Sequence, residues 1–369
     1  MASKLFTPIK LRDLTLNNRI VISPMGQYSS ENGSATDWHL IHLGQFSLSG
    51  AGLVMTEVSA VNPVGRVSAE CAGMWSEANE IAMKRVIDAC KRYGVGAHGL
   101  QLGHSGRKGS SQTLVQGGKP LNPQQEGGWQ TVAPSALAYG QDWQTPLPLT
   151  RVEIDSLKVD FVEAVKRAHR IGYDLVELHA GHGYLMHQFL SPLSNQRSDE
   201  YGGSLENRLR LPLEVFALMR SVWPADKPMG IRVSATDWVE GGWNLDETVV
   251  FAQELKKLGC DYIDVSSGAL DLRQKIPIEA GYQVPFSEQV RARVDIPTMA
   301  VGLITEAKHA EEIISSGKAD MIALARGAMW DPRWAWHAAE ELGAEADYAP
   351  KTMACHPKLR PFLFKNRSK

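Results

Sequence analysis

Eight short apolar runs, rich in β-branched residues, recur along the chain, and a longer stretch of polar and helical sequence follows each of them. Parallel strands that helices cover on both faces have this uninterrupted apolar character. Eight strand–helix units in series predict an α/β fold, a closed (β/α)8 TIM barrel that occupies residues 1–369 as a single domain. The predicted strands lie in the runs Ile20–Ile22, Leu53–Val58, Gly96–Leu102, Asp174–Leu178, Met229–Ser234, Asp261–Ser266, Pro297–Val301 and Asp320–Leu324.

Apolar residues at helical spacing predict helices between these runs, among them Ala78–Tyr93, Val152–Ile171, Leu245–Leu258 and Thr305–Ser316. A glycine follows each of the four, as expected of a residue that ends a helix with a positive φ. These glycines are Gly94, Gly172, Gly259 and Gly317. An open, doubly wound sheet remains the alternative to the barrel, because strand order does not follow from strand count.

Two segments depart from a minimal barrel. Residues 103–150 follow the third predicted strand and are rich in Gly, Pro, Gln and Ser. They predict a long loop or small hairpin over the barrel mouth, since long loops in compact domains are usually functional. Residues 345–369 carry no helical period and are expected to reach a subunit interface.

Composition argues against several functional classes. A formal net charge of -2 and 43% hydrophobic residues are ordinary for a globular enzyme and offer no basic footprint for nucleic acid. No apolar run approaches the roughly 20 residues of a membrane span, and the first residues lack the apolar region of a secretory signal. The four cysteines are far apart, which predicts reduced thiols rather than a metal or disulfide framework. We therefore expect a cytoplasmic protein with neither membrane nor nucleic-acid partners.

The chemistry is expected where the fourth predicted strand ends, at residues 177–184. Loops at the C-terminal ends of barrel strands carry active sites. His179 and His182 are three residues apart in a glycine-containing turn, and as neutral donors they would stabilise charge developing on a substrate oxygen. Tyr184 would donate a proton from the same loop. A metal site with Glu177 as third ligand, and a purely structural role for both histidines, are the alternatives.

Two polar side chains interrupt otherwise apolar predicted strands. Arg232 lies within Met229–Ser234, where a buried charge is costly unless it is paired. It forms either a structural ion pair inside the barrel or a fixed cation beneath a cofactor that becomes anionic. Gln101 can both donate to and accept from the amide-like edge of a heteroaromatic ring.

The last two predicted strands end in sequences typical of a phosphate site. Barrels commonly bind phosphate on the loops after strands seven and eight, through backbone N–H groups and a helix N-terminus. Gly302 and Gly327 stand at those two positions, and Arg326 would add a charge-assisted contact.

Four ordered motifs run through the chain. They are Asn18-Arg19-Ile20 leading to Ser23-Pro24-Met25, Gln101 to Lys108, His179 to Leu185, and Asn195 to Arg208. Taken in one register, these motifs resemble the Old Yellow Enzyme family of FMN-dependent ene-reductases over nearly the whole chain. The resemblance is greatest to the bacterial thermophilic-like class that includes the xenobiotic reductases.

The resemblance implies a TIM barrel with FMN across the strand C-termini. The implied FMN-binding residues are Ser23, Pro24, Met25 and Ala60 at the ring, Gln101 and Arg232 at its pyrimidine edge, and Ala300, Gly302, Ala325 and Arg326 at the phosphate. His179 and His182 would bind the carbonyl or nitro oxygen of the substrate, and Tyr184 would supply the α-proton. NADPH or NADH would reduce FMN, which would then pass hydride to the β-carbon of an activated alkene in a ping-pong cycle.

Two details of the class pattern concern the substrate pocket, which Tyr28 flanks. Members typically carry a cysteine after the Pro-Met pair, where this chain has Gly26. The class also brings an arginine from the C-terminal tail of a neighbouring subunit, for which Arg360 is the candidate. A homodimer or homotetramer is implied by the resemblance.

Three other functions compete with this one. Longer dienoyl-CoA reductase and amine dehydrogenase relatives need an iron–sulfur cluster, for which the cysteines here are wrongly spaced. A flavin-free isomerase or aldolase barrel would use the same phosphate site but leave Gln101 and Arg232 without a partner. A pure binding module does not need two histidines and a tyrosine over a phosphate site.

Overall fold

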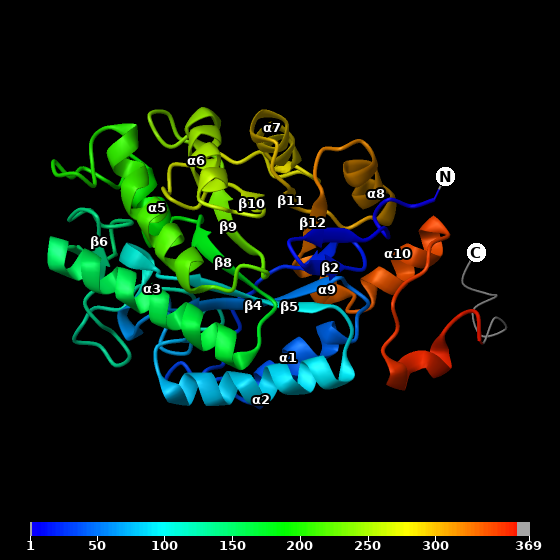
Figure 1. The fold of residues 1–369 in the computed structure, drawn as a ribbon. Coiled ribbons are helices and arrows are strands. Elements are labelled where there is room, and N and C mark those ends of the chain that lie inside the picture. The colour runs from blue at the N-terminus through cyan, green and yellow to red at the C-terminus, as the bar shows by residue number, and fades with distance from the viewer. Residues whose placement is uncertain (1, 360–369) are drawn as a thin grey trace.

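The computed structural model describes residues 2–359, and eight parallel strands close into a barrel within them (Figure 1). The predicted TIM barrel is confirmed, and the open sheet is excluded because the last strand pairs with the first, with Ile322 beside Ile20. In order around the barrel the strands are β3 (Ile20–Ile22), β4 (Leu53–Ala60), β5 (Ala97–Gly103), β8 (Leu175–Ala180), β9 (Met229–Ser234), β10 (Ile263–Ser266), β11 (Thr298–Val301) and β12 (Met321–Leu324).

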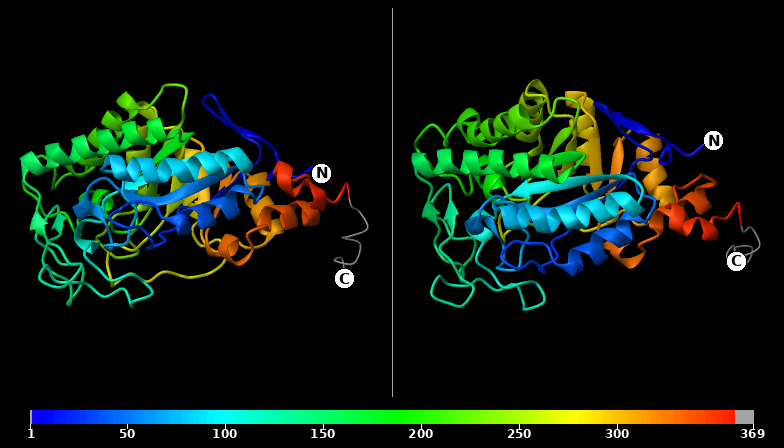
Figure 2. Two further views of the ribbon diagram at one scale, coloured as in Figure 1. Left: turned by 90° about the horizontal axis from the view of Figure 1, so that it is seen from below. Right: turned by 60° about the horizontal axis from the view of Figure 1, so that its bottom comes forward.

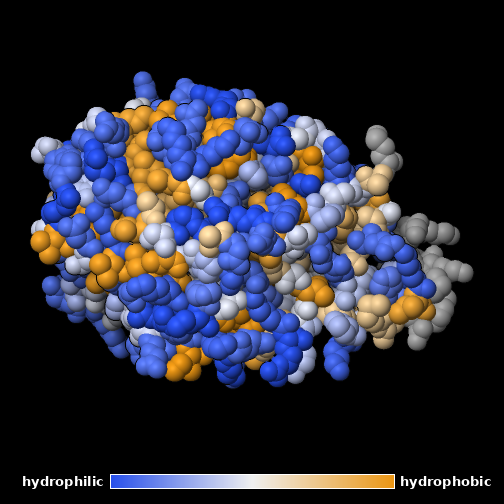
Figure 3. Space-filling model, in the orientation of Figure 1, coloured by the Kyte–Doolittle hydropathy of each residue, from blue (hydrophilic) through white to orange (hydrophobic). Residues whose placement is uncertain are grey.

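Helices surround this barrel, and Figure 2 shows α2 and α3 lying along its outside from two further directions. The helices are α1 (Asp37–Ser47), α2 (Glu77–Tyr93), α3 (Arg151–Ile171), α4 (Leu185–Leu190), α5 (Leu205–Val222), α6 (Leu245–Lys257), α7 (Val284–Val294), α8 (Ala307–Ser315), α9 (Arg326–Trp330) and α10 (Trp334–Leu342). Strand and helix limits differ from the predicted ones by a few residues, because single-residue capping decides them. On the face that Figure 3 draws, hydrophilic and hydrophobic residues are interspersed.

Helix α3 illustrates how local sequence sets these limits. Thr150 precedes the helix, and its hydroxyl accepts a hydrogen bond from the backbone N–H of Glu153 at 3.3 Å. The Glu153 carboxylate accepts the Thr150 N–H at 2.7 Å in return, which completes a capping box. At the other end, Gly172 stops the helix with φ +98°. Polar residues at both ends thus satisfy the backbone groups that a helix leaves unpaired.

Three of the four glycines predicted to have a positive φ do so: Gly172, Gly259 at +84° and Gly317 at +76°. The prediction is wrong for Gly94, whose φ of -91° and ψ of -174° are extended. A side chain there would place its Cβ 2.6 Å from Cβ of Ser47. Close packing between the end of α2 and α1, rather than backbone handedness, therefore requires this glycine.

A short hairpin, absent from the sequence prediction, lies against the inside of the barrel. Its antiparallel strands are β1 (Ile9–Leu11) and β2 (Leu14–Leu16). Leu11 and Leu16 are buried in one cluster with barrel residues such as Met55, Tyr262 and Met299. Each strand has three residues, too few to show a period of two in the sequence.

The insertion between β5 and α3 contains the short 3-10 helix η2 (Gly106–Lys108) and the two-residue strands β6 (Val132–Ala133) and β7 (Leu147–Pro148). Strands β6 and β7 pair in parallel, so a long loop is confirmed there and a hairpin formed by them is not. Lys108 Nζ donates to the carbonyl oxygens of His182 at 2.9 Å and Ala269 at 2.8 Å. These bonds fasten the insertion to the loops that follow β8 and β10.

The described part of the tail, residues 345–359, contains the 3-10 helix η3 (Pro350–Cys355), although no helical turn was predicted there. Tyr348 stacks on Trp336 of α10, with ring centroids 4.3 Å apart. Figures 1 and 2 show this segment at the opposite end of the molecule from the insertion. Arg360, the candidate intersubunit residue, lies outside the described residues.

Candidate active site

Two adjoining cavities open where the barrel strands end. The first has a volume of about 190 Å³ and is lined from β3, β4, β5, β8 and β9 and the loops after them. The second, of about 230 Å³, lies at the ends of β10, β11 and β12. His182, Arg232 and Ala325 line both, so the two cavities adjoin and share part of their walls.

Most residues predicted for the site line these cavities. The first is lined by Ser23, Pro24, Gly26, Tyr28, Gln101, His179, His182, Tyr184, Arg232 and Ala325. Gly302 and Arg326 line the second. Ala60 lines a small recess beside the first cavity. Met25 and Ala300 line neither cavity, since Met25 packs against the core and Ala300 is fully buried in β11.

The two histidines and Tyr184 form a compact group at one wall of the first cavity. The ring centroid of His179 lies 5.0 Å from that of His182 and 5.2 Å from that of Tyr184, in edge-on arrangements. His182 Nε2 lies 2.7 Å from the hydroxyl of Ser266 on β10. His179 belongs to β8 itself, whereas His182 and Tyr184 occupy the turn that joins β8 to α4.

Burial sets the protonation of this group. It lowers the pKa of His179 and of His182 well below the ordinary value, and the nearby Arg232 cation lowers both further. Burial also raises the pKa of Tyr184 above its ordinary value. At neutral pH the imidazoles are therefore uncharged hydrogen-bond donors and the phenol keeps its proton. Both states agree with the roles predicted for them.

Beneath the cavity, a network of buried polar side chains crosses the barrel. Arg232 Nε lies 3.0 Å from Oδ2 of Asp264 on the neighbouring strand. Gln101 Nε2 donates to Glu177 Oε1 at 2.8 Å. Arg232 is thus an ion-pair partner and also lines both cavities, and its role beneath a cofactor stays a prediction. Glu177 binds Gln101 and does not join the histidines as a metal ligand.

The carboxyls of this network have unusual acidity. Burial, followed by repulsion from Asp264, raises the pKa of Glu177 to about 8. Burial also raises the pKa of Asp264, although the Arg232 cation opposes this. Glu177 is mostly protonated at neutral pH, so Arg232 faces less negative charge than two carboxylates would supply. The carboxyls therefore cancel only part of the positive potential of Arg232, and the remainder can attract a ligand in the cavity.

Several residues of the site were not found from the sequence. Glu57 and Cys71 line the first cavity, and Glu57 accepts the backbone N–H of Gln27 at 2.9 Å beside Tyr28. Glu57 lies in a predicted strand, and a single carboxylate there matches no recognisable functional motif. Cys71 lies on a loop after β4 whose approach to the cavity depends on tertiary packing alone.

The second cavity has the features of a phosphate site, with one difference from the prediction. Gly302 has φ +124°, and a Cβ on it would lie 2.9 Å from Gln283 Nε2, so only glycine leaves this wall open. Arg326 is exposed beside the cavity. Helix α9, which begins there, has only five residues, and few aligned peptides contribute to its dipole. Arg326 and loop amides therefore have to supply most of the attraction for an anion.

The motif from Asn195 to Arg208 is structural. Asn195 Nδ2 donates to the carbonyl oxygens of Phe189 at 2.8 Å and Tyr201 at 2.7 Å. Arg208, at the start of α5, donates to Glu247 of α6 at 2.6 Å. These bonds hold α4, α5 and α6 together behind the site without reaching either cavity.

Within residues 2–359, the structure contains no group of three or more His, Cys, Asp or Glu residues placed to hold a metal ion. Its cysteines Cys71, Cys90, Cys260 and Cys355 are all unpaired thiols. In the same part of the chain, none of the helices has the length and apolarity needed to span a membrane.

The site fits a flavin mononucleotide. The buried hydroxyl oxygen of Ser23 has no hydrogen-bond partner among the described residues, although it lies in the wall of the first cavity. Such an orphaned polar group is costly unless a ligand pairs with it. Gln101 and Arg232 also line the first cavity and carry hydrogen-bond donors. The adjoining second cavity can bind an anion such as the phosphate of the cofactor. A barrel mouth with two adjoining cavities, one lined by Gln101 and Arg232 and the other by Arg326, suits a flavin-dependent oxidoreductase of the TIM-barrel type.

Comparison with known proteins identifies the family. Residues 4–345 match the model of the NADH:flavin oxidoreductase / NADH oxidase family. The chain therefore belongs to this family, the Old Yellow Enzyme family, and is an NAD(P)H-dependent flavin oxidoreductase with FMN as its cofactor.

Its relatives are of similar length. The chain is 42% identical over 351 residues to the NADPH dehydrogenase of Listeria innocua, covering 95% of this chain and 98% of that protein. It is 41% identical over 347 residues to the NADPH dehydrogenase of Bacillus subtilis, covering 94% and 97%. The structure of morphinone reductase matches with a TM-score of 0.77 and 29% identity, over 95% of this chain and 93% of that one.

A 2-naphthoyl-CoA reductase structure matches more closely in shape, with a TM-score of 0.83, but at 23% identity. The match covers 92% of this chain and 52% of the other, so the chain spans about half the length of that protein. This likeness establishes the fold alone.

Proposed function

We propose that the protein is an ene-reductase that reduces activated alkenes, such as α,β-unsaturated carbonyl and nitro compounds. The observation that carries this proposal is the grouping of His179, His182 and Tyr184 in one wall of the cavity that Gln101 and Arg232 also line. When bound by the residues of the two cavities, FMN would supply the hydride-transfer chemistry between NAD(P)H and the β-carbon of the alkene. The protein has to bind the substrate oxygen and supply a proton.

The chain's own residues are suited to these two tasks. His179 and His182 are neutral donors that bind the carbonyl or nitro oxygen and stabilise the charge that gathers there as hydride arrives. Tyr184, on the same wall, holds a proton at neutral pH and donates it to the α-carbon. Arg232, paired with Asp264, offers a positive charge toward the cofactor space. Tyr28 and Gly26 line the same cavity and would contact the substrate there.

Anaerobic absorbance spectroscopy of the purified protein tests both half-reactions. We expect flavin bands that bleach on addition of NADPH and return on addition of 2-cyclohexenone. The bands could instead bleach with NADPH and not return with 2-cyclohexenone, a nitroalkene or an enal. That result would be consistent with NADPH oxidation alone and would contradict the ene-reductase proposal.

We further propose that the chain acts as one domain in a cytoplasmic homodimer or homotetramer. The support is the match to NADPH dehydrogenases over nearly their full length, together with a tail that extends away from the insertion. Light scattering of the purified protein measures the assembly directly, and a monomer would contradict it.

A further inference from the structure

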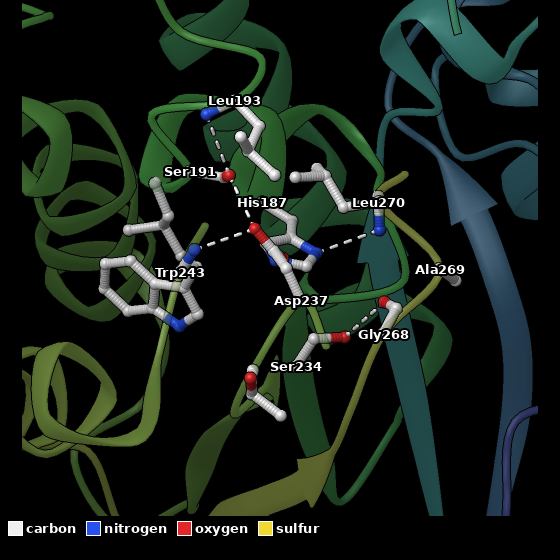
Figure 4. Close-up of polar contacts among 12 residues, drawn as sticks. His187, Ser191, Leu193, Ser234, Asp237, Trp243, Gly268, Ala269 and Leu270 are labelled. Atoms are coloured by element: carbon white, nitrogen blue, oxygen red, sulfur yellow. Dashed lines mark hydrogen bonds and ion pairs between the residues drawn. The ribbon is translucent and has the colours of Figure 1, made fainter. Parts of the chain in front are cut away.

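Behind the catalytic turn lies a buried histidine–aspartate pair that the proposed chemistry does not use (Figure 4). His187 on α4 accepts the backbone N–H of Gly183 at Nδ1, at 2.9 Å. Its other ring nitrogen, Nε2, lies 2.8 Å from Oδ1 of Asp237, and both side chains are completely buried. Gly183 stands between His182 and Tyr184 in the chain. The His187–Asp237 pair therefore contacts the residue that links these two groups of the active site.

The aspartate is held as firmly as the histidine. Asp237 Oδ2 accepts the hydroxyl of Ser191 at 2.6 Å and the backbone N–H of Trp243 at 2.8 Å, as Figure 4 shows. Ser191 follows α4, whereas Asp237 and Trp243 belong to the loop between β9 and α6. The carboxylate therefore joins two loops at the barrel mouth, and neither of its oxygens is free to move.

These contacts select one form of the imidazole. Because Nδ1 accepts the Gly183 N–H, it must carry a lone pair, and the proton of the neutral ring must be on Nε2, next to the carboxylate. The opposite tautomer would set N–H against N–H at Gly183 and leave the carboxylate facing a lone pair. The Gly183 contact requires this tautomer, and the negative charge of the Asp237 carboxylate, 2.8 Å from Nε2, favours it over the other one.

The turn needs such support, since its backbone is unusual. His182 has φ +53°, a backbone angle that residues other than glycine rarely adopt. Gly183 has φ +69°, and a Cβ on it would lie 2.2 Å from the carbonyl oxygen of Ala269. Ser234 holds the first residue by accepting the His182 N–H at 2.9 Å while its own hydroxyl donates to Gly268 at 3.0 Å. His187 is the matching support for the second.

We propose that His187 and Asp237 are positioning residues, which hold the Gly183 amide so that the hydroxyl of Tyr184 points to the reacting carbon. Helix α4 begins directly after Tyr184, and His187 lies in its first turn, so a shift of the imidazole moves the phenol with the helix start. The inference rests on the proposed function, because it assigns Tyr184 the proton donation.

Two substitutions at one position separate the two contacts of His187. The carbonyl oxygen of asparagine takes the place of Nδ1, whereas the amide nitrogen of glutamine takes the place of Nε2. His187→Asn therefore keeps an acceptor for Gly183, and His187→Gln keeps a donor to Asp237. In stopped-flow experiments on the FMN-loaded protein, we expect His187→Gln to slow reoxidation by 2-cyclohexenone about tenfold more than His187→Asn does. Flavin reduction by NADPH, which takes no proton from Tyr184, should stay within about twofold in both.

A double-mutant cycle identifies the route of the effect. In a Tyr184→Phe background, His187→Gln should change reoxidation by less than about twofold, because the group that it positions is gone. Equal reoxidation rates in the two His187 variants, equal losses in both half-reactions, or a full effect of His187→Gln in the Tyr184→Phe background would each overturn the proposal.

A measurement on the unaltered protein stays decisive if the variants do not fold. Nitrogen-15 NMR of the histidine-labelled holoprotein should show the His187 proton on Nε2, and a proton on Nδ1 would overturn the inference. This measurement needs no alkene turnover. A wild-type protein that shows the expected tautomer but reduces no alkene would contradict the proposed function while leaving the hydrogen-bond arrangement established.

Discussion

Burial keeps the three main side chains of this site in their uncharged forms, and these forms are the ones that the proposed chemistry needs. His179, His182 and Tyr184 are all shifted toward their neutral forms, and in each case burial is the largest cause. A neutral imidazole is a donor that does not hold a substrate anion too tightly, and a neutral phenol is an acid that releases its proton only to a strong base.

Tyr184→Phe should slow reoxidation of the reduced enzyme by 2-cyclohexenone by roughly 10²-fold, the usual contribution of a positioned general acid. Reduction by NADPH should change little, because that half-reaction needs no proton from the phenol. Stopped-flow absorbance measures the two rates separately. Tyr139→Phe, which alters a partly buried phenol near Lys108 outside the first cavity's wall, is the matched control.

Glu177 should make stability depend on pH. Its pKa is about 8 in the folded protein against an ordinary 4.5, so between these values the folded state holds a proton that the unfolded state has released. Stability contributed by this group is therefore complete below about pH 4.5 and is lost as pH rises toward 8. In urea unfolding, wild type should lose stability relative to Glu177→Gln over that range, by a few kcal/mol at most. A constant difference would contradict it, and Glu126→Gln, at an exposed position, should show no such trend.

Gly26→Cys should restore the thiol that the class usually carries. A Cβ at this position would meet ring atoms of Tyr28 at 3.7 and 3.8 Å, which is ordinary van der Waals contact, so the backbone can accept a side chain here. We expect a changed preference among alkenes and a flavin midpoint potential shifted by on the order of tens of millivolts. Gly26→Ser fills nearly the same space with oxygen in place of sulfur, and identical behaviour of the two variants would remove the thiol from the explanation.

Residues with a motif around them could be predicted from the sequence, and those that reach the site through tertiary packing could not. His179 lies near the end of β8, and His182 and Tyr184 lie in the turn directly after it, so their proximity follows from local sequence. Asp237 reaches His187 from another loop 50 positions later, and Cys71 enters the cavity from a loop with no regular structure. Nothing in a single sequence specifies those approaches.

At the scale of elements, the insertion is the part that adapts the barrel to its chemistry. Lys108 lies in η2 and fastens the insertion to carbonyl oxygens at positions 182 and 269. Burial, followed by repulsion from Arg107, lowers the pKa of its ammonium to about 7. Loss of this cation would release two loops of the barrel mouth together.

Lys108→Met should therefore speed amide hydrogen exchange at residues 181–184 and 268–270 and lower turnover about tenfold. The physical reason is the loss of two hydrogen bonds that Lys108 Nζ donates, each worth about 1.5–3 kcal/mol when the ammonium is charged, so the effect should be largest below pH 7. Lys119→Met, at an exposed position on the same insertion, should change neither. Unchanged exchange in Lys108→Met would show that other contacts hold the insertion.

Helices and strands could be predicted from the sequence where the patterned stretch was long, and they were missed where it was short. All eight barrel strands and the four named helices were located to within a few residues. The hairpin of β1 and β2 was missed because its two strands are three residues each. The pairing of β6 with β7 was also missed, since two-residue strands have no pattern and their contact depends on how the insertion folds back.

At the scale of the molecule, the interior of the barrel depends on that hairpin. Leu11 and Leu16 are 3% and 1% exposed and complete the apolar cluster inside the strands. Leu16→Ala should lower the free energy of unfolding by about 2–5 kcal/mol, as for other large cavities in a core. Thr15→Ala, on the exposed side of β2, should change it by less than about 0.5 kcal/mol. Equal effects in urea unfolding would place the hairpin outside the core.

The pairing of β12 with β3 also has a consequence for how the protein is made. Strand β3 has β4 and β12 as its two neighbours, and β12 leaves the ribosome about 300 residues after the hairpin. At about 5–20 residues per second, Leu11 and Leu16 wait about 15 to 60 seconds for a complete barrel around them. During that interval the nascent chain presents apolar leucines and an unpaired strand edge. The hairpin and the outer edge of β3 can therefore be covered only when nearly the whole chain has been synthesised, although both are buried in the finished enzyme.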